Sequence, residues 1–332
     1  MSTTETSAVA TGRDVDAAIN TAALQGAVDL ADTGVNRRSG KIKWVKLRVL
    51  VRMPLQLICV LFLVAMVLIA IFVSPMVQGL ADAQDLSLRL LPPFSTEHGF
   101  WYILGSDSLG RSELAQIIFG ARSSFLVAGL VVLFSCVIGT TLGLVSGFLG
   151  GWVDAAVMRI ADVVVAVPTL LLAVAVLFVL QPSMFNLVLV LSISRLPAYM
   201  RTARGQTLQI REQVFIEASR SLGATRSRII AFDVAPLVVP PIMTVAMLDI
   251  AGVILAASGL SFLGLGLHRP DVDWGMLVAD GRGYLGKGWW MTVFPGLAIA
   301  LTSLASNFLS NWLRAMDDPG QSGRLISKLF KK

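Results

Sequence analysis

The chain has 332 residues, of which 55% are hydrophobic and only 14% are charged, and its mean hydropathy is +0.75. This composition excludes an ordinary soluble domain, a disordered chain and a disulfide-rich secreted module, because those classes are more polar or richer in cysteine. The formal net charge of +6 accompanies long apolar segments, so we attribute it to membrane topology and anionic lipid headgroups, with no nucleic acid partner.

The chain begins with a polar segment, residues 1–36, that is rich in Ala, Thr and Asp. It has no apolar run of the length that a secretory signal needs, so we expect a disordered cytoplasmic tail. Residues 37–95 are predicted to hold a basic lead-in, the first transmembrane helix and an external loop. This first helix is expected to serve as an uncleaved signal anchor.

Six apolar segments are candidates for transmembrane helices. A helix needs about 20 apolar residues to cross a hydrocarbon core of about 30 Å, and the segments that meet or approach this length are 54–76, 123–149, 160–181, 184–200, 234–258 and 291–313. The fourth is short and contains Arg195 and Pro197. It is retained because the basic loop that follows it would otherwise lie across the membrane from the basic N-terminal segment. We therefore predict an all-α polytopic membrane protein with six transmembrane helices.

Basic residues set the orientation, because Lys and Arg near span ends are retained on the cytoplasmic side. With six spans, the basic run within 37–52, the 201–233 loop and the basic tail 319–332 all fall on one side of the membrane. Both termini are therefore predicted to be cytoplasmic.

The second span contains three glycines at four-residue spacing, Gly139, Gly143 and Gly147. Residues four apart share one face of a helix, and glycines there allow a second helix backbone to approach closely. We interpret these glycines as a helix-packing seam.

The 201–233 loop has helical composition interrupted at Gly223, which predicts a helix, a glycine turn and a second helix. The second piece is expected to turn Ile229, Ile230 and Phe232 toward the membrane domain, and Arg226 and Arg228 toward water or an acidic partner. A small apolar patch beside the turn comprises Ala218, Leu222 and Ala224. Such a patch is unfavourable in water unless a partner covers it.

The segment Glu217–Ala218–Ser219, followed by Gly223 and Pro236, resembles the signature of ABC importer permeases, in which Glu-Ala-Ala precedes a Gly and later a Leu-Pro pair. Here Ser219 and Ala235 replace the usual Ala and Leu. The resemblance is greatest to the second, C-type permease of the dipeptide/oligopeptide/nickel group. It extends over about 100–318 and is carried by 104–111, 120–123, 150–154, 260–266, 274–282 and 294–296.

The resemblance implies the type I ABC importer permease fold in a bacterial or archaeal cell membrane, with 96–318 as the transmembrane domain and 201–233 as its coupling loop. The residues implied in ATPase coupling are Glu217, Ala218, Ser219, Leu222, Gly223 and Ala224. The implied partners are a second homologous permease, two ABC ATPase subunits and an extracytoplasmic substrate-binding protein. ATP and Mg²⁺ are expected to bind the ATPase subunits, because this chain has no phosphate-binding loop motif and is not itself an enzyme.

Asp249 is a candidate for the translocation path, because a carboxylate within a span usually faces an aqueous cavity or a partner group. In the resembling family a Glu often stands near the end of the fifth span, where this chain has Ala257. One interpretation is that Asp249 lines the path and favours cationic or amine-bearing substrates. The other is a structural ion pair, with Arg195 as the candidate partner.

Two further charged residues, Arg159 and Asp162, are expected to pair along one helical face. The only histidines, His98 and His268, stand alone in external loops, and Cys59 and Cys136 lie inside spans. No metal site is therefore predicted.

The function favoured by the resemblance is import of dipeptides or oligopeptides. Import of nickel or another small solute by the same fold stays open. A rival from another class is an ion-coupled secondary transporter with Asp249 as the titrating group, although no internal repeat of the kind common in such proteins is evident. A structural or assembly protein with a degenerate coupling loop is the third alternative.

Overall fold

The computed structural model describes residues 54–95 and 98–317. The expectations for 1–36, for the basic run within 37–52 and for the tail 319–332 lie outside them. Within the described residues the fold is helical, and the only strand-like pairing is an isolated bridge between Ser106 and Ser112. The fold class predicted from sequence is confirmed.

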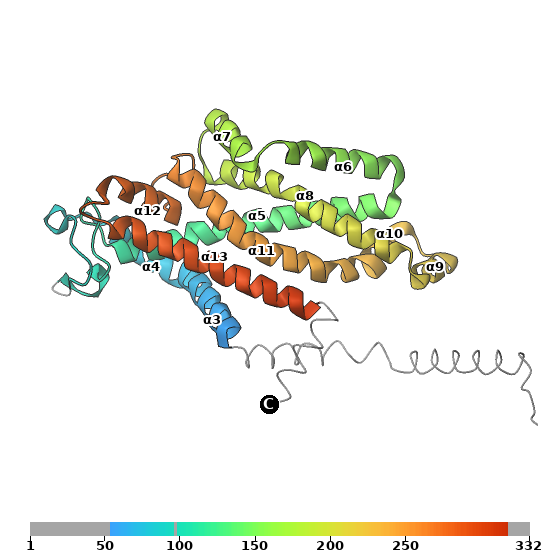
Figure 1. The fold of residues 1–332 in the computed structure, drawn as a ribbon, viewed down its shortest axis with the longest axis horizontal. Coiled ribbons are helices and arrows are strands. Elements are labelled where there is room, and N and C mark those ends of the chain that lie inside the picture. The colour runs from blue at the N-terminus through green and yellow to red at the C-terminus, as the bar shows by residue number, and fades with distance from the viewer. Residues whose placement is uncertain (1–53, 96–97, 318–332) are drawn as a thin grey trace, which may run out of the picture. The chain divides into compact units, whose positions relative to one another are not determined.

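The helices follow one another in the order α3 (Pro54–Leu68), a π-helical turn η2 (Ile69–Val73), α4 (Ser74–Asp82), η3 (Leu86–Leu88), η5 (Phe100–Tyr102), α5 (Glu113–Leu149), α6 (Gly151–Ala166), α7 (Thr169–Leu180), α8 (Met184–Arg211), α9 (Val214–Ser221), α10 (Arg226–Arg228), η6 (Ile229–Val234), α11 (Ala235–Phe262), α12 (Trp274–Gly281), η7 (Arg282–Tyr284) and α13 (Trp290–Asp317). Helices α5, α8, α11 and α13 run alongside one another, and α6 and α7 both contact α8 (Figure 1). Helix α3 leans away from α5, whereas η2 and α4 pack on it.

Four of these stretches are long and apolar enough to cross a membrane: Pro54–Asp82, Glu113–Leu149, Arg226–Phe262 and Trp290–Ala315. The third predicted span is broken into α6 and α7, which meet at an angle of 84° and count as a fifth span only if taken together. Pro168 explains the break, because proline removes a helical hydrogen bond and disfavours helix in the residue before it. Helix α8 has 28 residues and is long enough to cross a membrane, but it is more polar than the four helices above. The predicted count of six spans is therefore only approximate.

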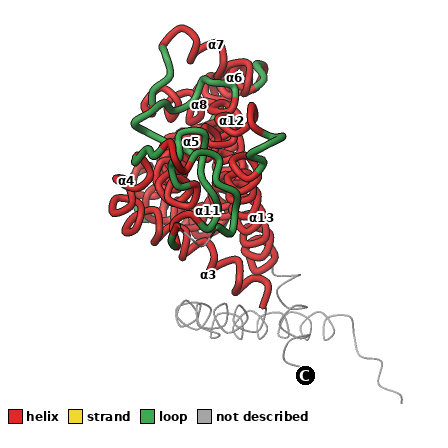
Figure 2. The backbone as a smooth tube through the Cα atoms, turned by 90° about the vertical axis from the view of Figure 1, so that its left-hand side faces the viewer, coloured by secondary structure: helices red, strands yellow, loops and turns green. Residues whose placement is uncertain are grey.

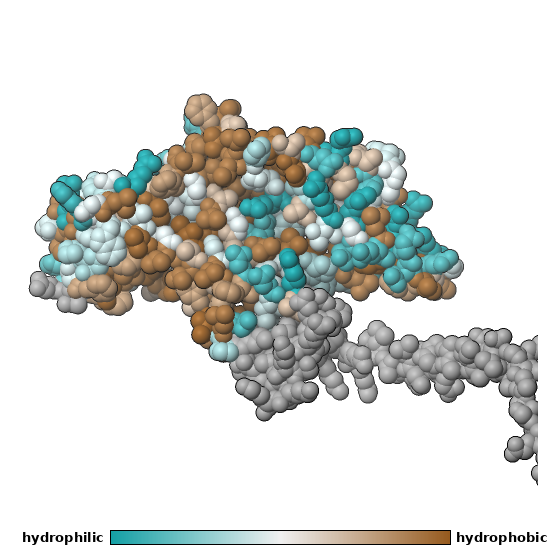
Figure 3. Space-filling view, in the orientation of Figure 1, coloured by the Kyte–Doolittle hydropathy of each residue, from teal (hydrophilic) through white to brown (hydrophobic). Residues whose placement is uncertain are grey.

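Loops gather at one end of the body, where they join α4 to α5 and α11 to α13 (Figure 2). Apolar side chains cover the middle of the visible face, and hydrophilic ones cover the end that carries α9 and α10 (Figure 3). This distribution is the one that a lipid-facing surface between two aqueous ends requires.

The interior has two apolar clusters. The larger one surrounds the first half of α5 and includes the fully buried Trp274, whose indole N–H donates to the carbonyl of Ile117 at 2.9 Å. The second, which we call the loop-side cluster, lies toward α9 and comprises Leu144, Phe148, Tyr199, Ala203, Ile216, Ile229, Val234, Val238, Ile242 and Ala246. Each end of the body therefore has its own core.

Candidate functional site

Helix α9 ends in a glycine turn inside the predicted coupling loop. The amide of Gly223 donates to the carbonyl of Arg220 at 2.9 Å, and the amide of Ala224 donates to the carbonyl of Ser219 at 3.1 Å. This pair of bonds is a Schellman motif, which requires a residue in the left-handed region at the turn, and Gly223 adopts a φ of +83°. The predicted helix, glycine turn and helix are confirmed. The loop is more helical than expected, because α8 continues to Arg211.

An apolar stripe runs along the exposed side of α9. Val214 and Leu222 expose 81% and 88% of their surface, and Ala218 between them is also exposed. The four-residue spacing places all three on one face. Ala224, which we expected in this patch, is half-buried and packs against the loop-side cluster. Val214 takes its place, and the sequence analysis missed this residue although its four-residue spacing from Ala218 could have identified it.

The opposite side of the loop is anchored in the body. Ile216 and Ile229 are fully buried in the loop-side cluster, and the guanidinium of Arg220 lies 5.3 Å from the ring centroid of Phe148. The expectation that Phe232 faces the membrane domain is wrong, because this side chain is 75% exposed. It falls within the π-helical turn η6, whose wider winding departs from the α-helical spacing on which the expectation rested.

Ionic contacts hold the base of the loop. Arg204 of α8 pairs with Asp154 of α6, with 2.6 Å between Nη2 and Oδ2, and Ser146 of α5 donates to the same carboxylate at 2.7 Å. Arg211, the last residue of α8, donates to the carbonyl of Gly147 at 2.9 Å. Bidentate pairs of Arg and carboxylate fix geometry as well as adding energy. Helices α5, α6 and α8 are therefore joined just before the chain enters α9.

Gly139, Gly143 and Gly147 lie against α8. A β-carbon on Gly139 would lie 2.7 Å from Cβ of Tyr199, and one on Gly147 would lie 2.9 Å from Cβ of Thr207. At Gly143 it would meet the carbonyl oxygen of Met200. No side chain fits at such separations, so the close approach of α5 and α8 depends on these glycines.

Asp249 of α11 is paired with two residues of α8. Nη1 of Arg195 lies 3.3 Å from Oδ1 of Asp249, and the hydroxyl of Tyr199 donates to Oδ2 at 3.2 Å. The side chain of Asp249 is only 10% exposed. Gly252 makes room for the cation, since its β-carbon would lie 3.3 Å from the Arg195 guanidinium. The structure thus contains the ion pair with Arg195 that was one of the two interpretations.

The expected pair between Arg159 and Asp162 does not form. Asp162 instead receives a hydrogen bond from Arg201 of α8 at 2.8 Å. Both side chains of this pair are about half exposed, so its contribution to stability is small, about 0–1 kcal/mol. A contact 39 residues away in sequence cannot be read from helical spacing.

A buried polar network at the opposite end of the body was not found from the sequence. The carboxylate of Asp107 accepts bonds from Nε of Arg111 at 2.6 Å and from Nε2 of Gln116 at 3.1 Å. The amide oxygen of Gln116 accepts a hydrogen bond from Nη2 of Arg269 at 2.8 Å. The same Nη2 lies 3.7 Å from Oδ2 of Asp280. The network joins the α4–α5 loop, α5, the α11–α12 loop and α12.

Asp273 caps α12 beside this network. Its carboxylate accepts bonds from the Met276 amide at 2.8 Å and from the Ser261 hydroxyl at 2.5 Å. Burial raises the pKa of Asp273 above its usual value, and the bond from Ser261 opposes that rise. Among the residues that the structure describes, no three His, Cys, Asp or Glu side chains are placed to hold a metal ion.

Comparison with known proteins gives relatives over most of the chain. The family model described as binding-protein-dependent transport system inner membrane component matches residues 139–322. The probable D,D-dipeptide transport system permease protein DdpC of Escherichia coli (strain K12) is 38% identical over 271 residues, which cover 82% of this chain and 89% of the relative. The dipeptide transport system permease protein DppC of Alkalihalophilus pseudofirmus is 35% identical over 265 residues, 80% of this chain and 86% of that one. The glutathione transport system permease protein GsiD of Pectobacterium atrosepticum is 40% identical over 216 residues, 65% and 72% respectively.

A solved structure shares the fold. A chain of the MetNI methionine ABC transporter, in an inward-facing conformation, superposes with a TM-score of 0.50 at 18% identity, and the match covers 60% of this chain and 95% of that one. At this identity the likeness concerns the arrangement of helices alone.

Proposed function

Because this chain belongs to the family of binding-protein-dependent transport system inner membrane components, we propose that it forms part of the membrane path of an ATP-driven peptide importer. It is an ABC permease subunit and not the ATPase, as its relatives are named permease proteins. Membership implies a place in the inner membrane, and partnership with ATPase and substrate-binding components.

Peptides are the proposed cargo, in the size range of dipeptides and oligopeptides. The support is that the relatives are named for D,D-dipeptide, dipeptide and glutathione transport. These substrates share a peptide backbone with charged termini. Nickel or another small solute is the alternative cargo, and a direct uptake measurement separates the two.

The apolar stripe on α9 is proposed to dock on the ATPase. Val214, Ala218 and Leu222 are exposed while Ile216, on the other side of the same helix, is fully buried. The exposed side carries Glu217 as a polar neighbour. The Schellman turn at Gly223 ends the helix so that only a short, rigid surface projects. This observation carries the proposal, because a monomer gains nothing by exposing such a stripe to water.

The complete assembly is proposed to contain a second homologous permease and two ATPase subunits, with ATP and Mg²⁺ bound by the ATPases. Both termini and α9 are proposed to face the cytoplasm, which places the loops between α4 and α5 and between α11 and α13 on the side of the substrate-binding protein. Closure of the ATPases would then move α9 and, through the ionic contacts at its base, α8 as a rigid lever.

The test is uptake and ATP hydrolysis by the complex purified through a tag on this chain. Leu222→Asp places a charge on the proposed docking surface at a position that is 88% exposed, so the fold tolerates it. We expect ligand-stimulated hydrolysis and peptide uptake to fall at least about tenfold, the effect of about 1.4 kcal/mol. Ser227→Asp adds the same charge at another exposed position of the loop and should leave ligand-stimulated hydrolysis and peptide uptake unchanged.

Equal loss in the two variants would reject the docking surface. Transport along an ion gradient by the chain without any ATPase would instead support the secondary transporter. Uptake of nickel but not of peptides would correct the cargo alone.

Asp249 is proposed to line the path together with Arg195. The support is that the Arg195 side chain remains 28% exposed although the pair lies within helices, as expected of groups beside an aqueous cavity. Asp249→Asn keeps the shape of the side chain. If the assembled variant transports peptides at the wild-type rate, the pair is structural and the proposal fails.

A further inference from the structure

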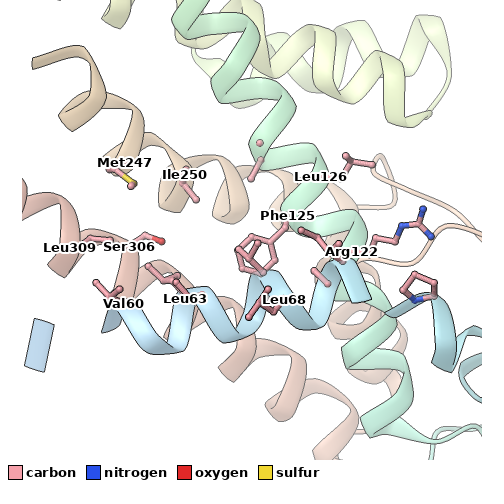
Figure 4. Close-up of a pocket in the computed structure, with 17 residues that line it drawn as sticks. Val60, Leu63, Leu68, Arg122, Phe125, Leu126, Met247, Ile250, Ser306 and Leu309 are labelled. Atoms are coloured by element: carbon pink, nitrogen blue, oxygen red, sulfur yellow. The ribbon is translucent and has the colours of Figure 1, made fainter. Parts of the chain in front are cut away.

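An apolar groove separates α3 from the rest of the body. Its volume is about 800 Å³, within the range of about 300–1,000 Å³ that small-molecule sites occupy. On one side it is lined by α3, with Leu63 and Leu68, and by η2 and α4, which continue α3. On the other sides α5 contributes Phe125, and α11 and α13 contribute Ile250 and Leu309 (Figure 4). The groove is therefore a meeting point of segments that are distant in sequence.

One end of the groove is positively charged. Arg122 lies at this end, whereas Val60, Ser306 and Leu309 lie at the other (Figure 4). Within 54–95 and 98–317, no carboxylate pairs with Arg122 and no hydrogen bond of its guanidinium is present. A cation at the edge of a membrane helix bundle without an internal partner is suited to an anion from outside.

The groove is long enough to hold the acyl chains of a lipid. Val60 and Pro75 both line it, and fifteen helical residues span about 20 Å. The length exceeds one leaflet, about half of a 30 Å hydrocarbon core.

The groove is also reachable from the surface. Val64 and Leu68 of α3 are 49% and 48% exposed, Ile71 of η2 is 58% exposed, and Leu126 of α5 is 43% exposed. An acyl chain can therefore enter from the side without unfolding α3.

We propose that this groove binds an anionic phospholipid, with the phosphate on Arg122 and the acyl chains between α3 and the body. The lipid fills the gap left where α3 leans away from α5. It thereby fixes the first membrane helix to the helices that form the transport body. The site is separate from α9 and from the Arg195–Asp249 pair, and it does not depend on the cargo.

The test is native mass spectrometry of the purified importer complex titrated with phosphatidylglycerol or phosphatidylethanolamine. Arg122→Ala removes the cation, and we expect it to weaken phosphatidylglycerol binding at least about tenfold, because the lipid loses its charge-assisted hydrogen bond. Arg159→Ala removes another exposed arginine, on α6 outside the groove, and should bind the lipid as wild type does.

A second variant tests the apolar part without touching the charge. Gly129 lines the groove, and a β-carbon there would meet nothing within 4 Å. The phenyl ring of Gly129→Phe would therefore fill the space proposed for the acyl chains. It should also lower phosphatidylglycerol binding at least about tenfold. Wild-type binding by both Arg122→Ala and Gly129→Phe would overturn the proposal, as would equal binding of phosphatidylethanolamine.

A photoreactive residue in place of Leu63 identifies the occupant directly. A phospholipid adduct supports the proposed lipid site. Cross-linking to the second permease would instead show that the groove is a protein interface, and the lipid proposal would fail.

Discussion

Charged and polar side chains join four segments at the end of the body that carries the α4–α5 loop. At the other end, α9 itself is anchored by two buried isoleucines and one cation–π contact, and the ion pair of this end lies at the base of the loop, before α9 begins. Asp107 and Arg111 are 3% and 6% exposed and bonded to each other. Ile216 and Ile229 make no polar contact through their side chains. Directional bonds fix one geometry, while apolar contacts permit sliding. If α9 docks on the ATPase as proposed, this difference predicts that the first end stays in place while α9 moves with its partner.

The largest expected effect comes from breaking the ionic end. Asp107→Ala leaves Arg111 buried without its partner and removes the acceptor for Gln116. Removal of one member of a buried pair costs about 3–5 kcal/mol. We expect a clear fall in the melting temperature of the purified complex.

Asp85→Ala is the matched control, because Asp85 is exposed in the same loop and, among the residues that the structure describes, its carboxylate bonds only to nearby Ser87. It should change stability by no more than about 0.5 kcal/mol. Similar melting temperatures for the two variants would show that the network does not stabilise this end.

The second effect separates anchoring from docking on α9. Ile216→Ala opens a cavity in the loop-side cluster and should cost about 2–5 kcal/mol, seen as faster hydrogen exchange of the amides of 214–224. Leu222→Ala removes a side chain that is 88% exposed and should leave exchange unchanged in the permease while lowering stimulated ATP hydrolysis. If Leu222→Ala loosens the loop as much as Ile216→Ala does, the loop has no distinct anchored and docking sides.

Much of the helical plan could be predicted from the sequence, because long apolar runs leave few structures other than helices in a membrane. The turn at Gly223 could also be predicted, because the left-handed conformation that ends a helix favours glycine. The start of α5 was placed ten residues too late, because its first turns carry Glu113 and Gln116, whose polarity hides a helix that is buried against other loops.

Pairings between distant segments were harder to predict. Asp162 bonds to Arg201 rather than to Arg159, and the network of Asp107 and Arg269 joins loops that are more than 150 residues apart. Local spacing carries no information on such contacts, which depend on how the helices pack. The ion pair of Asp249 could be proposed only because few cations lie within the spans.

The smallest effect is a pH dependence confined to the ionic end. Burial raises the pKa of Asp273 in the folded protein above the value of about 4 that an aspartate has in the unfolded chain. As the pH rises above about 4, the unfolded chain therefore loses this proton before the folded protein does. Stability therefore falls as the pH rises through the raised pKa. Asp273→Asn keeps an oxygen to accept the Met276 amide and cannot ionise, so the slope should become shallower. It should not vanish, because burial raises the pKa of Asp280 as well. The measurement is the slope of the melting temperature against pH, from about pH 4 upward. Asp271→Asn, at an exposed neighbouring position, should retain the wild-type slope. If Asp273→Asn also retained the wild-type slope, burial of this carboxylate would not limit stability.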